Sequence, residues 1–338
     1  KALNLNVMDT IFGIKNNQHL RLGESLRIAK NKTGSSFNNR SFALLGDPAM
    51  KLAFPDYNVV TTHVNNKPVS QTPDTLKALQ LVTISGYIEN NGQVNTNFNG
   101  VIIPTVFDKP TNISTLSNDG LPGSPIVQFK VQRNIIYKGT ATVKNGMFTF
   151  SFVVPQDIQY NFGLGKISYY ARHESLIEDA TGAFTNVIIG GFSNTPVSDD
   201  KGPELRLYMN NDRFVSGGMT DENPSLLAFV MDDIGINTVG TGIGHDITAI
   251  LDANSSNPII LNDFYQADQD NYKKGTIRYP FRNLSEGRHT LTVKVWDVAN
   301  NSSEATIEFI VVKSEGIVVE HLLNYPNPFS TQTNFFFE

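Results

Sequence analysis

Residues 141–153 read ATVKNGMFTFSFV, and this stretch decides the fold class. An Asn145-Gly146 pair separates two short runs, and three phenylalanines alternate with smaller side chains in the second run. Asn and Gly tolerate the positive φ angles of a two-residue hairpin turn. Alternation with a period of two is typical of a strand that buries one face. The stretch therefore predicts a β-hairpin.

The same period of two extends over most of the chain. About seven such runs lie between residues 76 and 195, which is the number typical of a β-sandwich. A polar stretch with prolines at both ends, residues 196–204, predicts a linker. A second group of runs lies between residues 204 and 312 and includes the strictly alternating RHTLTVKVW at residues 288–296. These runs predict an immunoglobulin-like sandwich, whose core we expect to contain Phe229, Leu251, Trp296 and Phe309.

The first fifty or so residues follow a different pattern. Apolar residues at helical spacing predict a helix over residues 18–30, and residues 3–12 predict a second helix or a strand. The apolar run 42–45 predicts a strand that is ended by Gly46-Asp47-Pro48. We expect Asp47 to hydrogen-bond local amides, which is the usual role of aspartate in such a turn.

Composition excludes several classes of function. The chain of 338 residues has 27 Lys and Arg against 32 Asp and Glu, and a net charge of −5 without a basic block argues against nucleic-acid binding. It contains no cysteine, which excludes disulfides, thiolate metal sites and a cysteine nucleophile in this chain. No apolar run reaches the roughly 18 residues of a transmembrane helix.

Three segments resemble parts of gingipain-like cysteine peptidases of family C25 or of other proteins of the type IX secretion system. The helix at residues 20–32 and FALLGDPAMKL at residues 42–52 are similar to the last helix, strand and turn of the caspase-like peptidase domain. Residues 232–247 resemble the region after the catalytic domain in the sortases of the type IX secretion system. NYPNPF at residues 324–329 is similar to the start of the C-terminal domains of type IX cargo proteins.

Together these observations predict a mainly β fold with two tandem Ig-like β-sandwich domains, preceded by a short α/β remnant of a caspase-like peptidase domain. The expected boundaries are residues 1–55 for the remnant, 56–197 for the first sandwich and 198–313 for the second. Residues 314–338 would form a linker and the start of a type IX C-terminal domain. We expect the chain to be a piece of a longer protein.

The resemblance implies that this chain is the non-catalytic β-domain segment of a type IX sortase-like cysteine peptidase. Such a peptidase would process the C-terminal signal of cargo proteins at the outer membrane, with its Cys and His outside this chain. The implied partners are secreted cargo proteins and an outer-membrane β-barrel protein, and the implied location is the bacterial cell surface. Alternatives are a surface adhesin or glycan-binding module, or the C-terminal part of a secreted gingipain-like protease.

The sequence assigns no residue of this chain to a catalytic, cofactor or metal site, and it predicts no cofactor and no peptidase activity. Weaker patterns stay open. His245 beside Asp246 could be half of a catalytic or metal set, although no partner lies at a suggestive spacing. The pair Asp232-Asp233 and the group Asp268, Asp270 and Asn271 could each hold Ca²⁺, although neither has EF-hand spacing. Tyr160, Tyr169 and Tyr170 could stack on a sugar or could pack within the sheet.

Overall fold

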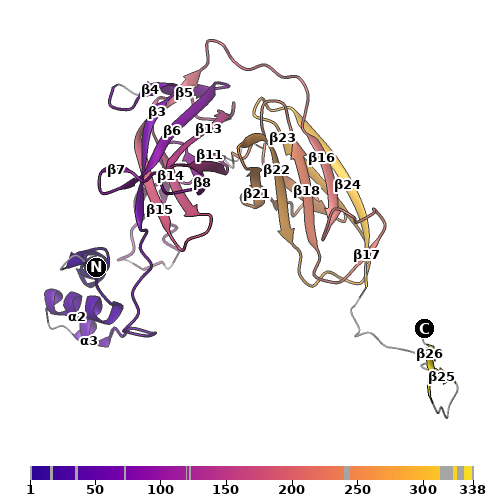
Figure 1. The fold of residues 1–338 in the computed structure, drawn as a ribbon, viewed down its shortest axis with the longest axis horizontal. Helices are drawn as coiled ribbons and strands as arrows, with labels where there is room; N and C mark the ends of the chain where they lie inside the picture. The colour runs from indigo at the N-terminus through magenta and orange to yellow at the C-terminus, as the bar shows by residue number, and fades with distance from the viewer. Residues whose placement is uncertain are drawn as a thin grey trace. The chain divides into compact units, whose positions relative to one another are not determined.

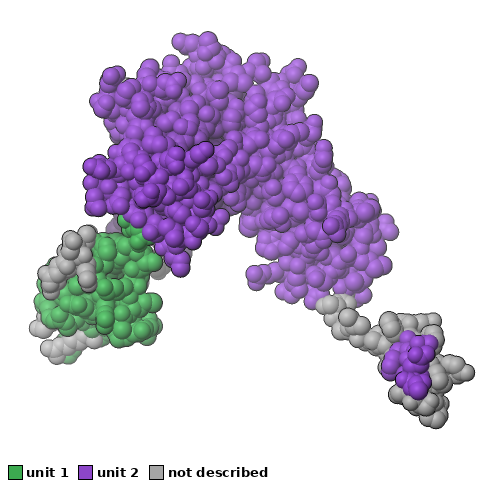
Figure 2. All heavy atoms as spheres, in the orientation of Figure 1, with its two compact units in different colours: residues 1–56 green, residues 57–338 purple. Residues whose placement is uncertain are grey.

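The computed structural model describes residues 2–15, 18–34, 37–71, 74–118, 120–121, 123–239, 244–312, 323–325 and 331–336. The chain falls into two compact units, residues 1–56 and residues 57–338 (Figure 2). The first unit is mostly helical, and the second is built from strands (Figure 1). The chain is therefore mainly β, as its periodicity predicts.

The first unit consists of helices α1 (Ala2–Ile11), α2 (Leu22–Thr33) and α3 (Phe37–Ser41) and the hairpin β1 (Ile14–Lys15) and β2 (Gln18–His19). The buried side chains of Leu3 and Ala29 place α1 against α2. The Thr10 hydroxyl reaches across to the carbonyl oxygen of Ser25 at 3.2 Å. Helix α2 ends at Gly34, whose φ of 83° favours glycine.

Two expectations for this unit need correction. The predicted helix over residues 18–30 begins only at Leu22, because residues 18–19 pair with β1 instead. The predicted strand at residues 42–45 is wrong: these residues have no regular structure, and Leu45 is 95% exposed. A strand needs a neighbour for its main-chain groups, and no described residue pairs with this segment. Asp47 behaves as expected, because its Oδ1 accepts the N–H of Ala49 at 2.8 Å.

The second unit begins with a closed barrel, where the sequence predicts a sandwich. Among the described residues, seven strands pair in a ring in the order β3, β15, β14, β8, β12, β13 and β6, and β6 pairs again with β3. The strands of this ring are β3 (Tyr57–Val64), β6 (Leu81–Asn90), β8 (Gly100–Phe107), β12 (Ala141–Lys144), β13 (Met147–Val153), β14 (Gly163–His173) and β15 (Asp179–Phe192). The alternation is the same in both architectures, because each strand has one buried face in a barrel as in a sandwich.

Further short strands extend this barrel or leave it. These strands are β4 (Lys67–Pro68), β5 (Thr75–Ala78), β7 (Gln93–Val94) and β11 (Ile135–Lys138), which pair with β3, β15, β6 and β8 respectively, and the separate hairpin β9 (Thr111–Ser114) and β10 (Gln128–Val131). The predicted Asn-Gly hairpin is confirmed between β12 and β13. Asn145 and Gly146 have φ angles of 51° and 75°, and Lys144 pairs with Met147.

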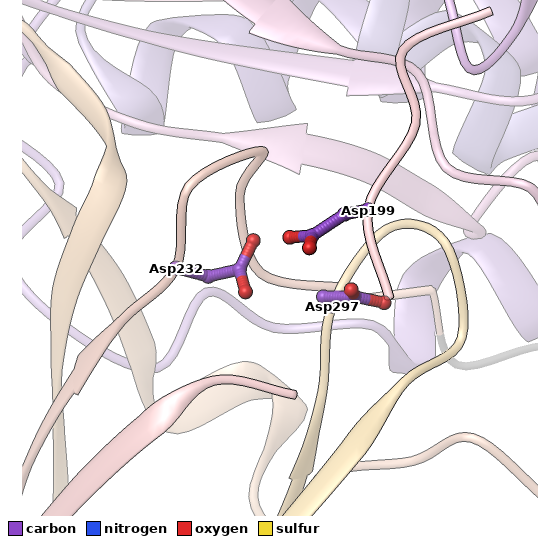
Figure 3. A group of neighbouring side chains, drawn as sticks. All are labelled: Asp199, Asp232 and Asp297. Atoms are coloured by element: carbon purple, nitrogen blue, oxygen red, sulfur yellow. The ribbon is translucent and has the colours of Figure 1, made fainter. Parts of the chain in front are cut away.

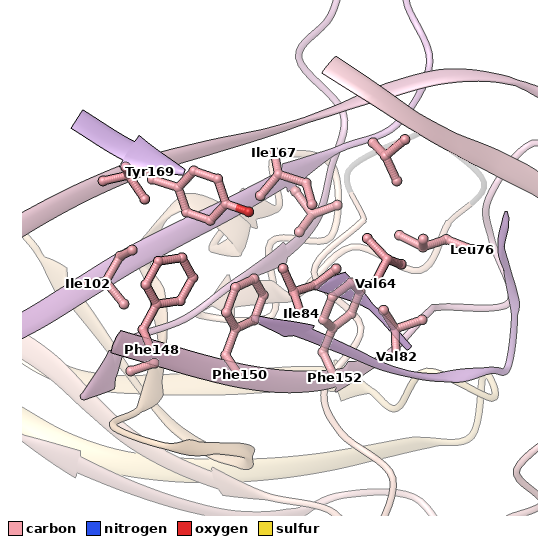
Figure 4. Packing of buried hydrophobic residues seen from close by; sticks show 14 of the residues in the cluster. Val64, Leu76, Val82, Ile84, Ile102, Phe148, Phe150, Phe152, Ile167 and Tyr169 are labelled. Atoms are coloured by element: carbon pink, nitrogen blue, oxygen red, sulfur yellow. The ribbon is translucent and has the colours of Figure 1, made fainter. Parts of the chain in front are cut away.

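The phenylalanines of residues 141–153 lie in the barrel interior. Phe148, Phe150 and Phe152 point into the barrel from β13, with neighbouring ring centroids 6.4 and 6.3 Å apart (Figure 4). Tyr169 of β14 lies among them, and its hydroxyl is satisfied by Thr61 Oγ1 at 2.8 Å. Burying these rings removes a large apolar area from water, which is the main source of stability in such a core.

A two-sheet domain follows. Within the described part of the chain, one sheet contains β16 (Glu204–Met209), β18 (Ser225–Met231), β22 (Asn271–Pro280) and β21 (Tyr265–Asp268) in that order, and the other contains β17 (Met219–Thr220), β24 (Ser302–Val311), β23 (Gly287–Trp296), β19 (Thr248–Leu251) and β20 (Ile259–Ile260). A short 3₁₀ helix, η1 (Asn262–Phe264), precedes β21. Buried residues from both sheets form one core, so this domain has two packed layers, and we call it the sandwich. A final pair, β25 (Leu323–Tyr325) and β26 (Asn334–Phe336), is described near the end of the chain.

The predicted core of the sandwich is partly wrong. Phe309 is fully buried and Leu251 packs against the core, as expected. Phe229 instead lies on the outer face of its sheet with 39% of its surface exposed, because Leu226, Ala228 and Val230 occupy the inward positions of β18. Trp296 is half-buried at the end of β23. The immunoglobulin-like topology itself stays a prediction.

Candidate functional site

The candidate site lies where the barrel meets the sandwich, within the second unit. Its centre is Asp157, which follows β13 and is almost fully buried, with 7% of its side chain exposed. Its carboxylate accepts hydrogen bonds from the side-chain amides of Asn237 and Asn300 at 2.8 Å and contacts His245 Nδ1 at 2.8 Å. All three partners belong to the sandwich. Because a carboxylate only accepts hydrogen bonds, His245 must carry its proton on Nδ1.

Further contacts join the two domains beside this network. The N–H of Gln156 donates to the carbonyl oxygen of Val298 at 2.8 Å, and a small apolar cluster of Val153, Ile234 and Val298 bridges the junction. On another side, Asp270 of the β21–β22 turn accepts the N–H of Thr142 at 2.7 Å and the hydroxyl of the same residue. Polar and apolar contacts thus hold the domains together at two separate places.

A cluster of three aspartates lies at the same junction. Asp232 follows β18, Asp297 follows β23, and Asp199 belongs to the connection between β15 and β16 (Figure 3). One carboxylate oxygen from each lies within 4.8 Å of the others. Asp232 and Asp297 are 7% and 0% exposed. Among the described residues, no ion pair involves any of the three.

Backbone amides fix the orientation of these side chains. Asp232 Oδ1 accepts the N–H groups of Ile234 and Gly235 at 2.8 and 2.9 Å. Asp297 Oδ1 accepts those of Ala299 and Asn301 at 2.9 and 2.7 Å. Local turns of this kind are common after strands, so each aspartate has a structural reason to be present.

The proximity of the three carboxylates changes their acidity. Burial, followed by the nearby charge of Asp297 and Asp199, raises the pKa of Asp232 to about 6, although two backbone hydrogen bonds oppose the change. Burial also raises the pKa of Asp297, and Asp199 adds to the effect. Near neutral pH the cluster therefore concentrates negative charge at a cost in free energy, which protonation or a bound cation would relieve.

The chemistry of this donor set suits a hard cation. Ca²⁺ prefers several oxygen ligands, and three carboxylates from three segments can supply them. Of the residues named for calcium from the sequence, Asp232 belongs to this cluster, whereas Asp233 is exposed and lies outside it. Asp268, Asp270 and Asn271 do not converge: Asp270 bonds to Thr142, and Asn271 caps the N–H of Lys273 at 3.0 Å.

Sequence reasoning missed Asp157, Asp199 and Asp297. A signal existed for two members of the cluster, because Asp232 and Asp297 each follow a strongly patterned strand directly and begin a turn. Nothing in the spacing brings Asp157 or Asp199 to the same place. His245 and Asp246, which the sequence suggested as a pair, do not act together: His245 bonds to Asp157 of the barrel. The preceding residues 240–243 lie outside the described residues.

A second arrangement resembles a catalytic triad in its residue types. His289 Nδ1 lies 2.8 Å from Asp252 Oδ2, and Ser285 Oγ lies 3.5 Å from His289 Nε2. However, Nε2 also lies 2.7 Å from the carbonyl oxygen of Ser285, to which it can only donate. Burial lowers the pKa of His289, but the bonds to this carbonyl and to Asp252 raise it by more. Because both ring nitrogens face acceptors, Nε2 is not free to take a proton from Ser285, and His289 links Asp252 to Ser285 structurally instead of acting as a general base.

The tyrosines do not form a sugar-binding platform together. Tyr169 is buried in the barrel core, whereas Tyr170 and Tyr160 are 42% and 49% exposed. This outcome matches the packing alternative for Tyr169.

Comparison with known proteins gives a similarity that spans almost the whole chain. No family model and no curated protein matches. The chain is similar to latent PorU from Porphyromonas gingivalis. The match has 29% identity and a TM-score of 0.46, and it covers 97% of this chain and 31% of that one, which is described as dimeric. The fibronectin(III)-like modules of Clostridium thermocellum CbhA match at 11% identity over 76% of this chain and 95% of theirs, with a TM-score of 0.22.

The chain thus spans about a third of the length of the PorU chain that it matches. The NYPNPF motif lies largely outside the described residues, which omit 326–330. No helix in the described part of the chain has the length and apolar character needed to cross a membrane.

Proposed function

We propose that this chain is the non-catalytic β-domain segment of a type IX sortase-like cysteine peptidase. Such a peptidase acts at the outer membrane and processes the C-terminal signal of cargo proteins. The observation that carries the proposal is the order of segments in one chain: a peptidase-like end at residues 42–52, two β-domains, and NYPNPF at residues 324–329. The sequence identity to PorU, over 97% of this chain, supports the same order.

In this proposal the chemistry belongs to residues outside the chain. A cysteine thiolate activated by histidine is the expected nucleophile, and this chain has no cysteine. Residues 1–55 would be the closing part of the peptidase domain, followed by β-domains at residues 56–197 and 198–313. These domains would position the peptidase at the cell surface and contact cargo or an outer-membrane β-barrel partner. The double junction at Asp157 and Asp270 supports this role, because it would make the barrel and sandwich a stiff spacer.

Two measurements on the purified chain test the proposal. We expect no peptide cleavage that a thiol-blocking reagent inhibits, and we expect immobilised chain to retain a purified C-terminal domain of a type IX cargo protein. Thiol-sensitive cleavage would contradict the non-catalytic assignment. Saturable binding on a glycan array without cargo retention would favour the adhesin or glycan-binding alternative. If neither cargo nor glycan binds, the C-terminal part of a secreted gingipain-like protease becomes the better assignment.

A further inference from the structure

A cleft of about 720 Å³ lies between the barrel and the sandwich and takes no part in the network around Asp157. Its barrel wall comes from residues 133–138, which include strand β11, and its sandwich wall from Thr238, Asp246 and residues 260–265, which include the end of strand β20. Binding sites often lie between domains, and this volume is in the range of ligand pockets, about 300–1,000 Å³.

The two walls carry opposite charges. Arg133 and Lys138 line the barrel side and are exposed, while Asp246 and Asp263 line the sandwich side. None of these four forms an ion pair with another described residue. Burial raises the pKa of Asp246, so its carboxylate gains from a nearby cation. A ligand with both an acidic and a basic group complements this cleft.

Each wall also contains a strand that pairs with a neighbour on one side only. Among the described strands, β11 pairs only with β8, and β20 pairs only with β19. An unpaired edge presents main-chain N–H and C=O groups that accept an added strand. Asn262 stiffens the sandwich wall, because its amide donates to the Thr238 carbonyl at 3.2 Å and accepts the Ile247 N–H at 3.0 Å.

We propose that this cleft binds an extended polypeptide segment as an added β-strand, with acidic side chains toward Arg133 and Lys138 and basic side chains toward Asp246 and Asp263. Successive side chains of a strand point to opposite faces, so a sequence in which acidic and basic residues alternate fits walls of opposite charge. The inference goes beyond the proposed function and does not rest on it, because binding requires neither a peptidase nor a cargo signal.

The test uses the full chain and two peptides of identical composition. The probe is the fluorescein-labelled octapeptide Glu-Lys-Val-Thr-Glu-Lys-Val-Thr, which places glutamate and lysine on opposite faces of a strand. The control, Glu-Val-Lys-Thr-Glu-Val-Lys-Thr, places both charges on one face. We expect fluorescence anisotropy to show saturable binding of the probe, at least about tenfold tighter than the control. A probe N-methylated at alternate residues should also lose about tenfold, because it lacks main-chain donors.

Protein variants locate the site. Arg133→Glu should weaken probe binding about tenfold, whereas Arg172→Glu, at an exposed arginine of β14 outside the cleft, should not. Hydrogen exchange should show new protection in β11 or β20 when the probe binds. Equal affinity for both octapeptides, an unchanged affinity of Arg133→Glu, or protection confined to other strands would overturn the proposal. The cargo-retention assay does not use the probe, so cargo retention by wild type together with equal affinity for both octapeptides would leave the proposed function intact while this inference fails.

Discussion

Replacing Asp232 with Asn should stabilise the sandwich near neutral pH. The amide oxygen of the new side chain can keep both backbone hydrogen bonds, to Ile234 and Gly235, while the buried negative charge disappears. The pKa of Asp232 rises from 3.8 to about 6, a difference of about two pH units. One pH unit corresponds to about 1.36 kcal/mol, so ionisation of Asp232 disfavours the folded state by about 3 kcal/mol. Water around the half-buried Asp199 screens part of this, so we expect a gain of about 1–2 kcal/mol.

The sign of this effect depends on pH in a defined way. Because the folded state binds the proton more tightly than the unfolded state, the wild-type chain loses stability as pH rises from about 4 through about 6. The advantage of Asp232→Asn should therefore be small near pH 4 and should reach its full value above about pH 7.

Fluorescence of Trp296, the only tryptophan, gives a local measurement, since Asp297 follows it directly. Urea unfolding of wild type, Asp232→Asn and the exposed control Asp233→Asn would be compared across this pH range with EDTA present. A loss of stability in Asp232→Asn at neutral pH, or a gain that does not vary with pH, would refute the electrostatic reasoning. Repeating the titration with millimolar-range Ca²⁺ shows whether a cation removes the penalty, in which case the wild type overtakes the variant.

Other expected outcomes follow from single contacts. His289→Gln should cost more stability at about pH 5 than at about pH 8, because a raised folded pKa contributes stability that is lost as pH rises through it; an NMR titration of His289 checks the pKa directly. Asp157→Ala removes three contacts between the barrel and the sandwich and should lower the free energy that couples the two domains by about 3 kcal/mol. Calorimetry should then show separate melting transitions for barrel and sandwich, and a single unchanged transition would contradict this. Gly146→Ala should destabilise the barrel by about 1–3 kcal/mol, since its Cβ would lie 2.4 Å from the Asn95 carbonyl oxygen; the control Gly92→Ala has a similar φ and open space, and an equal loss in both would exclude the clash.

Local rules were sufficient for most of the β elements. The Asn145-Gly146 turn and the alternation on either side predict the β12–β13 hairpin, and the run at residues 288–296 predicts β23 almost residue for residue. The predicted strand at residues 42–45 does not form, because an apolar run without a neighbouring strand to pair with does not make a strand. Phe229 shows a related limit, since hydrophobicity alone does not tell which face of a strand turns inward.

The sequence was enough to establish a mainly β chain without cysteine chemistry, because turn residues and the period of two act over only a few residues. Whether seven strands close into a barrel or stack as two sheets depends on β3 pairing with both β6 and β15, and the pair Tyr57 and Ala180 of β3 and β15 is distant along the chain. The same holds for the junction. Asp157, Asp199, Asp232 and Asp297 belong to separate segments, and the cleft has one wall from each domain. Only packing of the complete chain brings such groups together, because proximity in space is not encoded in local periodicity.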